Sequence, residues 1–180
     1  RRVASWSVAM SAFWAIAFSA LCLGFMNPIL YTLGASENTI TYARQYMFFV
    51  VVIGALPTVL SNTMSSMLRN VGYSKEAAFG LGMGGVLNVI LDPIFMFVIM
   101  PDGYEVMGAA IATLLSNVIA LIYYIVIYQK VKNVTIIELP KRIEKVLPES
   151  KKSLFSVGLP AACSLLLYDL TNMVINMLSS

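Results

Sequence analysis

An asparagine and an aspartate four positions apart, Asn88 and Asp92, are the side chains in this sequence best placed to do chemistry. Both lie in a long apolar stretch, and residues at this spacing emerge from the same face of an α-helix. Pro93 follows, and because proline has no N–H, the backbone carbonyl of Val89 loses its usual helical donor. Carboxylate, amide and carbonyl oxygens are the ligands that hard cations prefer, and a carboxyl group in apolar surroundings can instead take up a proton. We therefore predict a site for a hard cation or a proton, with an aspartate held only by an interhelical hydrogen bond as the alternative.

A polar face in the next apolar stretch could complete this site. Ala109, Thr113, Ser116 and Asn117 recur there at helical spacing. Thr113 could supply a hydroxyl group to the Asp92 site, although a threonine in a membrane helix can also simply pack against a neighbouring helix.

The last apolar stretch contains a second acid. Asp169 shares a helical face with Asn172, and Tyr168 precedes it. An acid at the centre of a membrane helix costs roughly 2.5–3.5 kcal/mol on insertion scales. Asp169, with Asn172 and Tyr168, is therefore a second candidate for proton or cation handling, and a structural role is equally open.

The composition indicates which elements must position these residues. Of the 180 residues, 59% are hydrophobic and 12% charged, and the mean hydropathy is +0.81. A soluble domain carries about 25% charged residues, and a bilayer-spanning helix needs about 20 mostly apolar residues. The chain contains five such stretches, so we predict an all-α, polytopic membrane helical bundle. The expected spans are Ala4–Leu33, Thr41–Leu68, Lys75–Met100, Val106–Gln129 and Lys152–Ser180.

Charge placement predicts how the spans are oriented. Turn residues around Gly34, Gly72 and Gly103 separate the first four spans, and short connections make sequential helices antiparallel. The basic residues then gather on one side, which the positive-inside rule assigns to the cytoplasm. That side carries Arg1, Arg2, Arg69, Lys75 and the basic residues from Lys130 to Lys152, and the other side carries Arg44 with Glu37, Asp102 and Glu105.

The segment 131–151 differs from the other connections because it is long and basic. Between Pro140 and Pro148, apolar and charged residues alternate in a way that suits a short amphipathic helix on the inner leaflet. A solvated linker whose basic residues only set the topology is the alternative.

Several classes of function are excluded or disfavoured. The sequence has no histidine, so it cannot supply histidine-based catalysis or a histidine-ligated metal site. Its net charge of +3 has a membrane explanation, so nucleic acid is not an expected partner. The stretch Gly80–Gly85 matches the dinucleotide motif G-x-G-x-x-G, but that motif requires a preceding strand. Inside a membrane helix we expect these glycines to allow close helix packing instead.

Three motifs in order resemble the multidrug and toxic compound extrusion (MATE) family. They are Leu68-Arg-Asn-Val-Gly72, Asn88-Val-Ile-Leu-Asp92-Pro93-Ile-Phe95 and Gly108-Ala-Ala-Ile-Ala-Thr113. The resemblance is nearer to the DinF-like branch and implies an internal fragment, spans three to seven of a twelve-helix transporter with two lobes. Residues 1–130 would then be four N-lobe spans, 131–151 the cytoplasmic linker and 152–180 the first C-lobe helix.

The resemblance also implies a function and a site. Asn88, Asp92 and Thr113 match the family's N-lobe site for Na⁺ or H⁺, which serves as coupling ion with no further cofactor. One branch of the family carries a glutamate in span seven, and the nearest matching position in this sequence is Tyr168. Asp169 lies one residue later, so its role in coupling stays open. The expected protein is no enzyme but an antiporter in the plasma (inner) membrane, exporting amphipathic small molecules. Its partners would be membrane lipids and the remainder of the same chain. A lipid-linked oligosaccharide flippase of the same superfamily, an intramembrane enzyme and a non-transporting membrane scaffold are the alternatives.

Overall fold

The computed structural model describes residues 2–131 together with 156, 163, 164, 167, 171 and 172. Among these residues there are helices joined by turns and short irregular stretches, and no strand, so the predicted all-α class is confirmed. The helices are α1 (Arg2–Gly24), α2 (Met26–Thr32), α3 (Ile40–Met47), α4 (Ala55–Asn70), α5 (Ser74–Ile94) and α6 (Glu105–Val131). Two π-helices, η1 (Phe48–Ile53) and η2 (Phe95–Ile99), continue α3 and α5.

The helices are long enough and apolar enough to cross a membrane where the sequence predicted spans. Ala4–Gly24, Ser74–Ile99 and Glu105–Val131 each qualify alone, and the bent pair Ile40–Ile53 and Ala55–Asn70 makes a fourth span. The predicted fifth span, Lys152–Ser180, falls almost wholly outside the described residues, as does the linker 131–151.

The first two predicted spans are not single straight helices, because each contains a proline. The predicted span Ala4–Leu33 breaks at Phe25, and Pro28 in the first turn of α2 has no N–H for the carbonyl of Gly24. The second span bends by 46° at Gly54, just before Pro57 in the first turn of α4. The kink that Pro57 predicts is therefore present, and η1 immediately precedes it.

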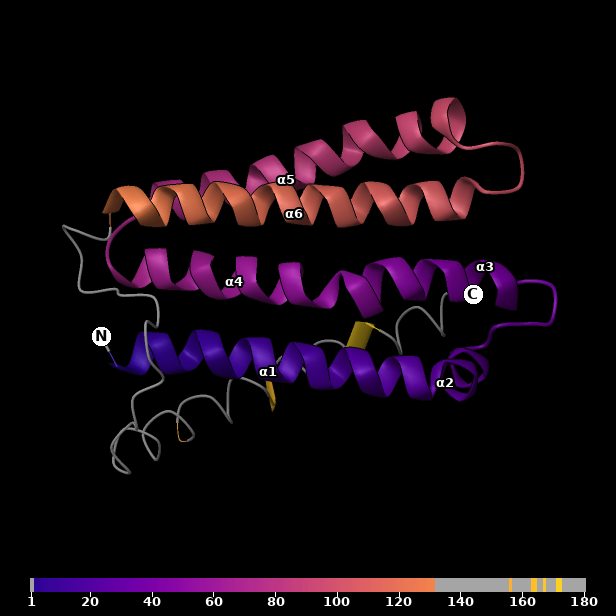
Figure 1. Ribbon diagram of the computed structural model, residues 1–180, viewed down its shortest axis with the longest axis horizontal. Coiled ribbons are helices and arrows are strands. Elements are labelled where there is room, and N and C mark those ends of the chain that lie inside the picture. The colour runs from indigo at the N-terminus through magenta and orange to yellow at the C-terminus, as the bar shows by residue number, and fades with distance from the viewer. Residues whose placement is uncertain (1, 132–155, 157–162, 165–166, 168–170, 173–180) are drawn as a thin grey trace. The chain divides into compact units, whose positions relative to one another are not determined.

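The chain divides into two compact units, and the larger ends at Ile143. All the contacts below lie within this larger unit. Its sequential spans run antiparallel through the turns that the sequence predicted (Figure 1). The glycine of each turn, Gly34, Gly72 or Gly103, has a φ of 91° to 92°, a conformation that other residues rarely adopt.

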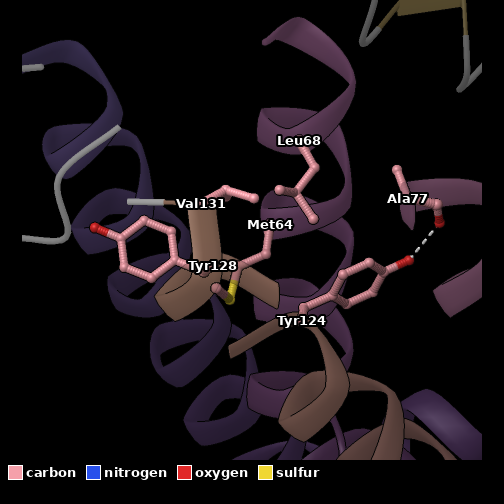
Figure 2. Close-up of a cluster of buried hydrophobic side chains, with 6 residues drawn as sticks. All are labelled: Met64, Leu68, Ala77, Tyr124, Tyr128 and Val131. Atoms are coloured by element: carbon pink, nitrogen blue, oxygen red, sulfur yellow. Dashed lines mark hydrogen bonds between the residues drawn. The ribbon is translucent and has the colours of Figure 1, made fainter. Parts of the chain in front are cut away.

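The helices α4, α5 and α6 pack against one another, and α1 runs alongside α4 (Figure 1). Six residues form the buried cluster where α4, α5 and α6 meet (Figure 2): Met64, Leu68, Ala77, Tyr124, Tyr128 and Val131. The same end of the unit carries Arg69, Lys75 and Lys130, in the last or first turns of these helices. This arrangement agrees with the predicted gathering of basic residues on one side.

Candidate cation site

Asn88, Asp92 and Thr113 come together in the structure. The Asn88 amide nitrogen Nδ2 donates to Asp92 Oδ1 at 3.1 Å and to Thr113 Oγ1 at 3.1 Å. The first bond links successive turns of α5, and the second joins α5 to α6. All three side chains are half-buried. The pairing on one face of α5 and the contribution of Thr113 from the next span were both predicted.

Two side-chain oxygens of this group accept no hydrogen bond from the described residues. Among the described residues, no donor forms a hydrogen bond with Asp92 Oδ2 or with Asn88 Oδ1. The group thus brings together a carboxylate, an amide and a hydroxyl group, whose oxygens are hard donors. The described part of the chain has no group of three or more His, Cys, Asp or Glu that could hold a metal. The donor set thus suits a monovalent cation or a proton better than a transition metal.

Asn88 presents its amide nitrogen, and not its amide oxygen, to both neighbours. The N–H groups point at the carboxylate of Asp92 and at the hydroxyl of Thr113. A Na⁺ ion between Asp92 and Thr113 would meet these N–H groups, so its binding requires the Asn88 amide to turn its oxygen inward. A proton on Asp92 Oδ2 requires no such rotation.

Pro93 and η2 shape the backbone next to Asp92. Pro93 lies inside α5 and removes the N–H that the Val89 carbonyl would accept, and the π-helix begins two residues later at Phe95. In η2 the N–H of Met100 bonds to the carbonyl of Phe95 at 3.1 Å. Such π-helical turns often occur at functional sites. Asp92 therefore lies near the point where the α-helix α5 gives way to the wider π-helix η2.

Close packing of α5 on α6 sets the position of the site. A side chain at Gly80 would meet the ring of Tyr124, and one at Gly84 would touch Ala120. At the other end, a side chain at Gly108 would come within 2.7 Å of the Phe95 carbonyl oxygen. The predicted role of these glycines in close helix packing is therefore confirmed for Gly80 and Gly84, whereas nothing lies within 4 Å of a side chain added at Gly82 or Gly85.

Other polar residues of α6 lie away from the site. Ser116 is buried, but its hydroxyl donates to the carbonyl of Ala112 at 2.8 Å, one turn back on its own helix. Ala109 and Asn117 are half-buried, and no contact of either with the cation group is found in the described part of the chain. Of the predicted polar face, only Thr113 is seen to bond to the cation group in the described residues, through Asn88.

The second candidate acid site cannot be placed. Asp169 and Tyr168 lie outside the described residues. Asn172 is helical and exposed. The proposal of a second site at these residues rests on the sequence alone.

The sequence analysis did not predict two features of the structure. The tyrosines Tyr123 and Tyr124 donate to the carbonyls of Glu76 and Ala77, at 3.3 and 2.7 Å, in the first turn of α5. On α3, the side-chain oxygen of Gln45 is buried without a hydrogen-bond partner. The sequence shows that these two tyrosines and this glutamine lie in apolar stretches. It does not show which helix their side chains contact.

Comparison with known proteins decides the family. The MatE family model matches residues 1–94, which is more than half of the chain. The chain belongs to the MatE family. The matched part contains Asn88, Asp92 and Pro93. The family resemblance drawn from the motifs is thereby confirmed.

Curated MatE relatives include the multidrug export protein MepA of two staphylococci. MepA of Staphylococcus aureus strain NCTC 8325 is 29% identical over 157 residues, covering 86% of this chain and 33% of MepA. MepA of Staphylococcus haemolyticus strain JCSC1435 is 27% identical over 175 residues, covering 97% of this chain and 37% of MepA. The chain thus spans about a third of the length of these relatives.

Solved MATE transporter structures share the fold. An inward-facing structure of a multidrug resistance MATE family transporter matches with a TM-score of 0.77 and 29% identity, over 88% of this chain and 35% of that one. An outward-facing structure matches with a TM-score of 0.80 and 29% identity, over 92% and 36%. These relatives are transporters, which agrees with the prediction that the chain is not an enzyme.

Proposed function

We propose that the chain is part of a secondary-active multidrug exporter in which Asp92 is the switch for the coupling cation. The observation that carries this proposal is the hydrogen-bonded group of Asn88, Asp92 and Thr113 on membrane-spanning helices of a MatE protein. The export of drugs or amphipathic organic compounds in exchange for Na⁺ or H⁺ is supported by the MepA relatives, which are named as multidrug export proteins.

The physical basis of the switch is the cost of a carboxylate in a membrane. An ionised Asp92 costs several kilocalories per mole unless it is paired, hydrogen-bonded or wet. Binding Na⁺ or H⁺ removes that charge and weakens the charge-assisted bond from Asn88. A cation can shift an equilibrium between two conformations only if it binds one of them more tightly. The affinity of Asp92 for the cation differs between the two conformations if water or the Asn88 amide reaches the carboxylate in only one of them.

The conformational change would move the four described spans largely as one body. The chain matches an inward-facing and an outward-facing transporter with similar TM-scores, 0.77 and 0.80. This similarity supports a rocking of lobes around a fixed site, as is common in secondary transporters.

Three further parts of the proposal rest on the family and the sequence. The protein would lie in the plasma (inner) membrane, with the basic ends of α4, α5 and α6 facing the cytoplasm. The numbering of the spans as three to seven of twelve and the DinF-like branch are also proposals. The assignments of 1–130 as four N-lobe spans, 131–151 as the cytoplasmic linker and 152–180 as the first C-lobe helix are proposals as well.

Asp92→Asn tests the switch in the full-length transporter reconstituted in vesicles. The variant keeps size and polarity but cannot be ionised, so Na⁺ or a pH step should no longer drive efflux of a cationic dye. Ser116→Ala is the matched control, because its hydroxyl bonds within α6, to the Ala112 carbonyl, and to nothing else among the described residues. Efflux at the unmodified rate in Asp92→Asn, with equal amounts inserted, would refute the assignment.

The flippase alternative predicts a different site. A pyrophosphate-linked substrate would need basic side chains inside the bundle. In the described part of the chain, Arg2 begins α1, Arg69, Lys75 and Lys130 lie in end turns of α4, α5 and α6, and Arg44 lies in the last turn of α3. None of the four basic residues of α3 to α6 has a hydrogen bond to Asn88, Asp92 or Thr113 there. The described spans therefore favour the exporter.

A further inference from the structure

A groove runs between α1 and α4 on the side away from the cation site. It encloses about 470 Å³, within the range of small-molecule pockets. Both tryptophans of the chain line it. The complete lining is Trp6, Ser7, Met10, Ser11, Trp14, Ala15, Phe18, Ala55 and Val59.

The groove lies beside the bend at Gly54. The straight helix α1 runs antiparallel to the second span, and two bonds attach it on either side of the bend (Figure 1). Thr63 Oγ1 donates to Ser11 Oγ at 3.0 Å, and Ser19 Oγ donates to the carbonyl of Val51 at 3.4 Å. Because the second span turns by 46° between these bonds, α1 cannot follow both parts closely. The gap opens at Ala55 and Val59, directly after the bend.

The groove continues as a polar strip toward the basic end of α4. Asn62, Ser66 and Arg69 follow Val59 at helical spacing on the same face, and all three are exposed. Arg69 Nη2 lies 3.4 Å from Ser66 Oγ, so the guanidinium group reaches back along this face. Neither α1 nor α4 contains an acidic residue, so neither helix neutralises Arg69.

The length of this surface matches one leaflet of a bilayer. Ten residues separate Val59 from Arg69, and at 1.5 Å per residue they span about 15 Å. This is half of the roughly 30 Å hydrocarbon core. With Arg69 at the headgroup level, Trp14, Phe18 and Val59 lie near the bilayer centre.

We propose that this surface binds an anionic phospholipid of the basic-side leaflet, with its phosphate on Arg69 and one acyl chain in the groove. Arginine suits phosphate because its planar donors match the phosphate oxygens. The aromatic and aliphatic lining suits an acyl chain. A cationic amphiphile of the kind we expect the protein to export would be repelled by Arg69, so the groove is distinct from the path of that substrate.

Quenching of tryptophan fluorescence by brominated lipids tests the proposal. The purified full-length protein would be reconstituted with equal fractions of dibromo-phosphatidylglycerol or dibromo-phosphatidylcholine. The signal of the groove is obtained by subtracting the same measurement on the Trp6→Phe/Trp14→Phe double variant. We expect both lipids to quench this signal, and phosphatidylglycerol to bind about five-fold more tightly, since one basic residue near the surface contributes about 1 kcal/mol.

Arg69→Gln should abolish the preference for the anionic lipid but leave the quenching by phosphatidylcholine. Lys75→Gln is the matched control, because it removes one charge at the same end of the unit from α5, which does not line the groove. Equal affinity for the two lipids in the unmodified protein would overturn the proposal. So would the absence of quenching by either, since another segment of the protein would then cover the groove.

Discussion

The hydroxyl of Tyr124 on α6 donates a 2.7 Å hydrogen bond to the backbone carbonyl of Ala77 in the first turn of α5 (Figure 2). Tyr124 is fully buried, and its ring lies over Gly80, where a side chain would collide with it. From this contact the packing continues through Gly84 and Ala120 to the bond between Asn88 and Thr113. The tyrosine thus sets the register of the two helices that form the cation group.

Gly80→Ala is expected to destabilise the protein because the new methyl group enters the space of the Tyr124 ring. Overpacking of this kind costs about 1–3 kcal/mol. Gly82→Ala is the control, because nothing lies within 4 Å of its added methyl group and alanine favours the helix. Thermal unfolding in detergent should show a lower Tm for the first variant and an unchanged or higher Tm for the second.

Tyr124→Phe removes only the hydroxyl group, so the expected loss is about 1 kcal/mol, that of one hydrogen bond. Tyr128→Phe is the control, because it also removes a hydroxyl group but on the next turn of α6, away from the Ala77 carbonyl. If the register matters for the site, Tyr124→Phe should also change the cation concentration for half-maximal efflux, and Tyr128→Phe should not. Identical cation dependence in the two variants would limit Tyr124 to a structural role.

Thr113→Val should weaken cation coupling, since it replaces the hydroxyl that bonds to Asn88 with a methyl group of similar size. A loss of about 1 kcal/mol would raise the half-maximal cation concentration about five-fold. Thr113→Ser, which keeps the hydroxyl, should restore most of the affinity. Asn117→Ala on the same helix is expected to leave the cation dependence unchanged, and a shift there as large as in Thr113→Val would contradict the assignment.

Pro93→Ala should separate helix stability from cation binding. Alanine restores the N–H for the Val89 carbonyl, so α5 gains a backbone bond and a better helix former. We expect an equal or higher Tm together with weaker cation dependence, because a bonded carbonyl is a poorer ligand. Circular dichroism during heating and efflux against cation concentration measure the two effects, and stronger coupling in this variant would refute a role for the carbonyl.

Gly108→Ala tests whether η2 must lie close to α6. The added methyl group would press on the carbonyl of Phe95, one turn after Asp92. Because this neighbour is backbone, η2 itself must shift, and we expect both a lower Tm and altered cation dependence. Gly85→Ala on α5, where nothing lies within 4 Å, is the control. Equal behaviour of the two variants would show that the approach of η2 to α6 is not required.

Much of the cation group was predictable because it is local. A spacing of four on one helix is enough to place Asn88 beside Asp92, and the absence of an N–H on proline is enough to weaken the backbone bond of Val89. The spans and the turns at Gly34, Gly72 and Gly103 likewise follow from hydropathy and from the conformations that glycine allows.

Contacts between helices were decided only by the tertiary structure. The sequence predicted Thr113 as a partner, but only the packing of α6 against α4 and α5 shows that Thr113 bonds to Asn88 while the Ser116 hydroxyl bonds within its own helix. The same holds for the bond of Tyr124 to Ala77 and for the groove beside Trp14, which needs the 46° bend of one span against a straight neighbour. Helical periodicity specifies which residues share a face, but only the fit of side chains between neighbouring helices specifies what that face meets.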